Sequence, residues 1–182
     1  EERNVNITVV VDASPSMFLG YKNVSKVQAS IEICCLLYLL AKETSDFITP
    51  IIIVDNAVHE LPLGSGEKGI TQFISALQKL ELLDKRGKIN LTRNHSIDNS
   101  ESKDLTLSLL KHMKRKREIV ILSDLLESFD VSQLKKIVYQ KNVHCFRIIC
   151  PLDEHNKKTM SVFSKSALSK NRFLNIKTSD EV

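Results

Sequence analysis

The chain has 182 residues, of which 42% are hydrophobic and 26% charged, the balance of an ordinary globular domain. Its formal net charge is only +4, aromatic residues make up 5% of it, and it contains no Trp. Nucleic-acid-binding domains usually carry a larger and more clustered basic excess, and single-stranded nucleic acids need aromatic side chains on which bases stack. We therefore expect no nucleic-acid partner.

The four cysteines have neither the spacing of a zinc site nor that of a disulfide framework. Cys34 and Cys35 adjoin in an expected helix, and Cys145 and Cys150 lie in an apolar run. We expect reduced thiols that pack as small hydrophobic side chains in the core, as is typical of cytoplasmic proteins.

No segment of the chain predicts a membrane span or a signal peptide. The longest apolar stretch, residues 31–41, contains Glu32 and is too short to cross a bilayer. The lack of an initiator Met suggests that the chain is a piece of a longer protein. We expect a cytoplasmic domain that would meet a membrane only through segments outside this chain.

The N-terminal part alternates between apolar strands and amphipathic helices. Residues 5–11 are almost all Val and Ile, which predicts a strand buried on both faces. A helix is expected over residues 24–42, with Ser25 as a candidate N-cap. A strand over residues 47–54 and a return strand over residues 57–63 then form a hairpin.

The rest of the chain repeats this alternation, interrupted by a polar stretch over residues 84–103 that we expect to be a loop. We predict helices over residues 68–83, 105–113, 131–141 and 157–168, and strands over residues 119–122, 143–150 and 172–176. Alternating strands and helices favour an α/β fold with a mostly parallel central sheet and helices on both faces. Ligands of such folds bind at the carboxyl ends of the strands.

Acidic residues follow two of the buried strands directly. Asp12 ends the first strand and is followed at spacing two by Ser14 and Ser16, and Asp124 follows the strand over residues 119–122. A carboxylate with hydroxyl groups is a suitable partial shell for Mg²⁺, which prefers oxygen ligands. Alternate residues of an extended turn can direct these side chains to one point. Alternatively, Asp12 caps the following turn and the serines satisfy loop amides.

These motifs resemble a known family. The sequence Asp-Ala-Ser-Pro-Ser-Met from Asp12, the apolar helix that contains Lys26, and Val-Ile-Leu-Ser-Asp-Leu-Leu around Asp124 are similar to the domain-of-unknown-function 58 family, over roughly residues 1–154. The resemblance implies a Rossmann-like von Willebrand factor A domain with a metal-ion-dependent adhesion site. Residues 155–182 would add a helix and a short strand.

The resemblance also implies ligands and partners. Mg²⁺, or Mn²⁺ or Ca²⁺, would be held by Asp12, Ser14, Ser16, a further Thr or Ser and, through water, Asp124. An open coordination position would accept an acidic side chain of a partner protein, and a MoxR-type AAA+ ATPase is the expected partner. The usual Thr before the third helix is missing here, so Ser102 is the expected substitute and Ser100 the alternative.

Two other functions stay open at this point. Asp12 could be the nucleophile of an aspartate-dependent phosphohydrolase, although haloacid dehalogenase-type enzymes place a second Asp where this chain has Ser14. The domain could also be structural, with a degenerate metal site. We expect a metal-dependent protein-binding module and not an enzyme.

Overall fold

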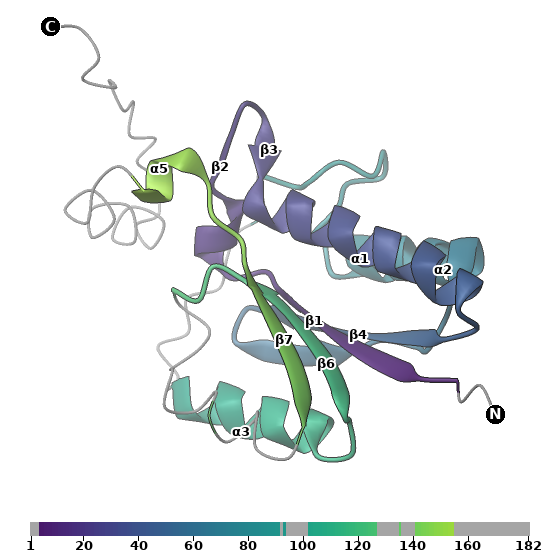
Figure 1. Ribbon diagram of the computed structural model, residues 1–182. Coiled ribbons are helices and arrows are strands. Elements are labelled where there is room, and N and C mark those ends of the chain that lie inside the picture. The colour runs from purple at the N-terminus through teal and green to yellow at the C-terminus, as the bar shows by residue number, and fades with distance from the viewer. Residues whose placement is uncertain (1–3, 92, 94–101, 127–134, 136–140, 155–182) are drawn as a thin grey trace, which may run out of the picture.

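The computed structural model describes residues 4–91, 93, 102–126, 135 and 141–154. Their main sheet has the strand order β5-β4-β1-β6-β7 (Figure 1). The strands are β1 (Asn6–Asp12), β4 (Phe47–Val54), β5 (Ala57–Glu60), β6 (Glu118–Ser123) and β7 (Asn142–Arg147). All neighbours are parallel except the pair β4 and β5. The expected α/β class with a mostly parallel sheet is confirmed, and it is compatible with a Rossmann-like fold.

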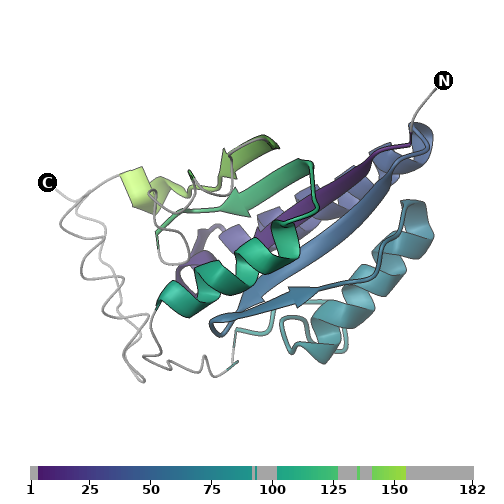
Figure 2. The same cartoon turned by 90° about the horizontal axis from the view of Figure 1, so that it is seen from below.

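The central strand β1 separates two hydrophobic cores. Val9 and Val11 point to the face covered by α1 (Lys26–Glu43) and α2 (Gly66–Lys79), and Val10 points to the face covered by α3 (Ser102–Met113). Figure 1 shows α1 and α3 on opposite sides of the sheet, and Figure 2 shows α3 lying over the sheet from below. Burial on both faces explains why the strand is a continuous Val and Ile run without polar alternation.

The first helix follows its prediction closely. Ser25 is its N-cap, and its side-chain oxygen accepts a hydrogen bond from the amide of Gln28 at 3.2 Å. The helix buries a stripe at three- and four-residue spacing that includes Val27, Ile31 and Tyr38. It begins two residues later than expected because Val24 and Ser25 form the short strand β3 (Val24–Ser25), which pairs with β2 (Gly20–Tyr21).

The hairpin of β4 and β5 is shorter than predicted. Asp55 and Asn56 both have positive φ, 48° and 56°, the combination that a two-residue hairpin turn needs. The return strand ends at Glu60 and not at residue 63. Pro50 is the fourth residue of β4, and its carbonyl accepts a hydrogen bond from the amide of Leu61 at 2.8 Å.

The second helix is displaced from its predicted range. It begins at Gly66, whose φ of +57° suits glycine, and it ends at Lys79. Asp84 then closes a tight turn, because its Oδ1 accepts hydrogen bonds from the amides of Arg86 and Lys88, both at 2.8 Å. The first part of the predicted loop is therefore an ordered turn, and residues 92 and 94–101 lie outside the described part.

The C-terminal part is described only as far as residue 154. Strand β7 ends at Arg147, three residues before its predicted end, and the short helix α5 (Pro151–Glu154) follows. The predicted helices over residues 131–141 and 157–168 and the predicted strand over residues 172–176 lie outside the described residues, apart from residues 135 and 141. Among the helices that the structure describes, none is long and apolar enough to cross a membrane.

The cysteines are free, as expected, but they are not all in the core. Cys34 and Cys150 are buried, Cys35 is half-buried, and Cys145 is exposed. The expectation of core packing is wrong for Cys145 because β7 is an edge strand of the sheet, where its side chains are largely exposed.

Candidate metal centre

The ends of β1 and β6 bring the predicted acidic residues to one edge of the sheet. The two strands are parallel neighbours, and Val11 pairs with Leu122. The next residues of the two strands, Asp12 of β1 and Ser123 of β6, therefore lie side by side. Asp124 directly follows Ser123. The three polar side chains are fully buried or nearly so.

The carboxylate of Asp12 is 0% exposed and held by hydrogen bonds. Its Oδ1 accepts a bond from the amide of Ser14 at 2.9 Å, and its Oδ2 accepts one from the Ser123 hydroxyl at 2.5 Å. The Ser123 oxygen in turn accepts a bond from the amide of Leu125 at 2.9 Å. Asp12 therefore caps the turn that follows it, as the alternative interpretation of the motif required.

The two serines converge, although the segment is not an extended turn. Ser14 is the N-cap of the 3₁₀ helix η1 (Pro15–Phe18), which Pro15 starts with its fixed φ. The Ser14 and Ser16 hydroxyl oxygens are 3.4 Å apart, and both side chains are buried. The Ser14 hydroxyl makes no capping bond to the backbone of η1. The two serine hydroxyls approach each other through a helical turn and not through the extended turn that the spacing predicts, and the convergence of Asp12 with them stays a prediction.

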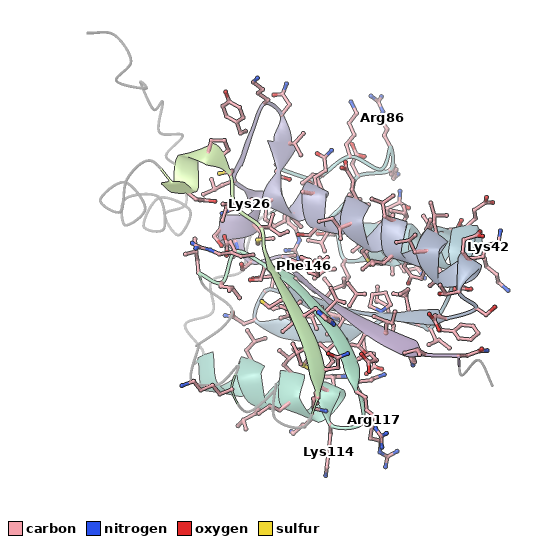
Figure 3. The ribbon with its side chains drawn as sticks, viewed as in Figure 1. Lys26, Lys42, Arg86, Lys114, Arg117 and Phe146 are labelled. Carbon is pink, nitrogen blue, oxygen red and sulfur yellow. The ribbon has the colours of Figure 1, made fainter. Side chains whose placement is uncertain are left out.

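Asp124 is engaged by a buried lysine. The Lys26 Nζ lies 2.8 Å from its Oδ2, and the amide of Leu126 donates to its Oδ1 at 3.1 Å. The same Nζ lies 3.2 and 3.3 Å from the carboxylate oxygens of Asp153 on α5. Figure 3 shows Lys26 where α1 begins, beside the carboxyl ends of the central strands.

Burial and charge act on Lys26 in opposite directions. Burial alone would lower the pKa of its ammonium group, whereas the hydrogen bonds and negative charges of Asp124 and Asp153 raise it. The net effect is a pKa above the ordinary 10.5 of lysine, so Lys26 is a permanent cation at neutral pH.

Three members of this cluster were not predicted as site residues. Ser123 could have been found, because it precedes Asp124 and the expected strand pairing sets it beside Asp12. Lys26 is a charged residue on the buried stripe of α1, which is itself a signal. Asp153 contacts Lys26 across 127 residues of sequence, and no local pattern indicates that contact.

The remaining predicted ligand is not settled by the geometry. Ser102 is the first residue of α3, but its side chain lies outside the described part of the structure, as does the whole of residue Ser100.

The residues that are described fit a hard cation in chemistry. No group of three or more His, Cys, Asp or Glu side chains able to hold a metal occurs among the described residues, so any site here depends on hydroxyl ligands. Two neighbouring ligands of an octahedral Mg²⁺ with bonds of about 2.1 Å lie about 3 Å apart. The 3.4 Å between the Ser14 and Ser16 oxygens is close to that distance. Carboxylates and hydroxyls supply only oxygen, the donor that Mg²⁺ prefers.

Comparison with known protein families gives a match over most of the chain. A family model described as "Protein of unknown function DUF58" covers residues 1–164, a range that contains every residue of the site described above. A comparison with curated proteins finds no match.

Proposed function

This chain belongs to the DUF58 family of proteins of unknown function, and we propose that it is a metal-ion-dependent protein-binding module of the von Willebrand factor A type. The cation would be Mg²⁺, or Mn²⁺ or Ca²⁺ in its place. Asp12, Ser14 and Ser16 would hold it, with Ser102 as a further ligand and Asp124 acting through a water molecule. When bound, the cation supplies positive charge to an acidic side chain of the partner.

One observation carries this proposal: two hydroxyl oxygens 3.4 Å apart lie in the turn that Asp12 caps, at the sheet edge that also carries Asp124. Parallel α/β sheets bind ligands at this edge. Burial of Ser14 and Ser16 keeps their hydroxyls away from bulk water, which strengthens their attraction to a cation.

The expected partner is a protein that offers a carboxylate, and a MoxR-type AAA+ ATPase is the partner class that the family resemblance suggests. The module would then act in the assembly or maturation of other proteins. The phosphohydrolase has less support, because haloacid dehalogenase-type enzymes place a second Asp where this chain has Ser14.

The ion pair of Lys26 and Asp124 favours a second candidate, a structural site in which the ammonium group takes the place of a metal ion. The two candidates differ in one property, because only the binding module gains stability from a divalent cation.

A titration with Mg²⁺ or Mn²⁺ and a thermal melting readout separates them. A cation that binds only the folded state stabilises it by about 2.7 kcal/mol at one hundred times its dissociation constant. We expect the melting temperature of the wild type to rise with cation concentration and that of Asp12→Asn to stay constant. Asp46→Asn is the matched control, since Asp46 lies before β4 at the opposite edge of the sheet and should leave the rise unchanged. An equal rise, or none, in wild type and Asp12→Asn would overturn the binding module.

A further inference from the structure

The buried cluster contains its own cation in contact with a proposed metal ligand. The side chain of Lys26 is 2% exposed, that of Asp124 1% and that of Asp153 10%. Lysine is rarely buried to this degree, because desolvation of an ammonium group is costly unless carboxylates compensate for it. Lys26 is therefore an integral part of this cluster and not a surface charge that happens to lie near it.

Because Lys26 contacts Asp124, it would compete with a divalent cation for the Asp124 carboxylate. At 2.8 Å, the Lys26 ammonium group takes up Oδ2 of Asp124, the side chain that would hold a metal-bound water. A second cation near the same carboxylate would be repelled by the first in surroundings that screen charge poorly. Cation binding must therefore weaken or displace the contact between Lys26 and Asp124.

Asp153 offers the displaced ammonium group another acceptor. Both of its carboxylate oxygens already lie within 3.3 Å of Lys26 Nζ. The amide of Cys150 donates to Asp153 Oδ2 at 2.8 Å and fixes the carboxylate in place. A lysine side chain has three donor hydrogens on a flexible stem, so a small movement can exchange one carboxylate for the other.

The formal charges of Lys26 and the three aspartates around it also favour an exchange of the ammonium group from Asp124 to Asp153. Asp12, Asp124 and Asp153 carry three negative charges and Lys26 one positive charge, which leaves a formal net charge of −2 in a buried cluster. A divalent cation would neutralise this charge, provided that the ammonium group has a carboxylate of its own. Asp153 is the carboxylate that the geometry provides.

We propose that Lys26 is a built-in competitor of the divalent cation for Asp124, and that Asp153 accepts the Lys26 ammonium group when Asp124 turns to the cation. This inference rests on the proposed function, because it presupposes a cation at Asp12, Ser14 and Ser16. It makes the segment after β7, where Asp153 lies, a regulator of metal affinity. By thermodynamic reciprocity, cation binding strengthens the contact between Lys26 and Asp153.

Calorimetric titration with Mn²⁺ tests this in a double-mutant cycle of Lys26→Met and Asp153→Asn. We expect Lys26→Met to bind Mn²⁺ at least about tenfold more tightly than the wild type, because the competing charge is gone. Asp153→Asn should bind it about tenfold more weakly, because the lysine is left with Asp124 alone. In the double variant the Asp153→Asn effect should vanish, since no ammonium group remains to be displaced.

Lys42→Met is the matched control for loss of one lysine charge, since Lys42 lies at the far end of the same helix (Figure 3) and should leave the affinity unchanged. If Lys26→Met does not fold, Asp153→Asn still tests the proposal, because it leaves the ion pair of Lys26 and Asp124 intact. Unchanged affinity in Asp153→Asn would then overturn it.

The outcomes also separate this inference from the proposed function. Wild-type protein that binds Mn²⁺ and Lys26→Met that binds it no more tightly would overturn the competition alone. An equal Asp153→Asn effect with and without Lys26 would show that Asp153 acts only through its charge, which also overturns it. If neither the wild type nor Lys26→Met binds Mn²⁺, the metal site itself fails. If Lys26→Met binds Mn²⁺ and the wild type does not, Lys26 excludes the cation completely, which supports the competition.

Discussion

Lys26 and Asp124, 98 residues apart in sequence, join the first turn of α1 to the end of β6 through a buried contact of 2.8 Å. The contact fixes the helix that covers one face of the sheet to the strand end where the candidate site lies. Both side chains are buried, so Asp124 depends on Lys26 for compensation of its charge, and Lys26 depends on Asp124 together with Asp153.

Breaking this pair from the lysine side should be costly. We expect Lys26→Met to lower the free energy of unfolding by about 3–5 kcal/mol, because it leaves the Asp124 carboxylate buried and without its ammonium partner. Urea denaturation measures the loss. Lys42→Met should change stability by less than about 0.5 kcal/mol, as is usual for exposed positions. A loss below 1 kcal/mol for Lys26→Met would contradict the burial of the pair.

The hydroxyl of Ser123 should matter more for stability than that of Ser14. Ser123 donates to Asp12 and accepts from the amide of Leu125, so Ser123→Ala leaves the buried Asp12 carboxylate and the partly buried Leu125 amide with one bond fewer each. We expect a loss of about 1–3 kcal/mol. Ser14→Ala removes a hydroxyl whose contact is the 3.4 Å approach to Ser16, and its main effect should be on cation affinity. Denaturation and Mn²⁺ titration of both variants check this contrast, which equal stability losses would contradict.

The order of the elements follows from the sequence because the signals are local. Runs of β-branched residues mark β1, β4 and β6, since strands buried on both faces tolerate little else. The range predicted for α2 is wrong at both ends, because each end depends on the backbone conformation of one residue. Gly66 begins the helix at positive φ, and Glu81, also at positive φ, follows its end. Apolar periodicity carries no information about either residue.

The candidate site was predictable in part for the same reason. Ser14 and Ser16 lie two residues apart in one turn, so the approach of their hydroxyls can be inferred from the motif alone. The ion pairs of Lys26 depend on how α1 and α5 pack against the ends of β1 and β6. Packing of this kind depends on the whole fold. A sequence motif contains only one of the two residues that form each contact.

The crossing of α1 and α2 depends on the absence of a side chain at Gly69. A Cβ built there would stand 2.5 Å from two ring carbons of Tyr38, which packs beside Phe73 with ring centroids 5.9 Å apart. In an open helix, Gly→Ala should stabilise by about 0.8–1.0 kcal/mol. We expect Gly69→Ala to destabilise by about 1–3 kcal/mol, because the ring must move.

The test is whether Gly69→Ala lowers or raises the stability of the protein. Ser75→Ala, on the exposed face of α2, is the control and should change stability by no more than about 0.5 kcal/mol. Thermal melting of both variants is sufficient. A Gly69→Ala variant that melts above the wild type would show that the two helices do not approach as closely as described.

Stability should fall at alkaline pH because of Cys34 on α1. Burial raises the pKa of its thiol far above the ordinary 9.0, with a smaller contribution from the neighbouring Cys35. Above pH 9 the unfolded chain releases this proton and the folded chain keeps it, so the unfolded state binds fewer protons and stability decreases with pH.

The slope contributed by one such group approaches about 1.4 kcal/mol per pH unit as the pH rises above 9. Urea denaturation at pH 8.5, 9.0 and 9.5 measures it below the ordinary pKa values of tyrosine and lysine. Cys34→Ala should flatten the slope whatever its effect on stability at neutral pH, because it removes the titrating group and leaves the others. An identical slope in wild type and Cys34→Ala would mean that the thiol is not as deeply buried on α1 as its 0% exposure implies.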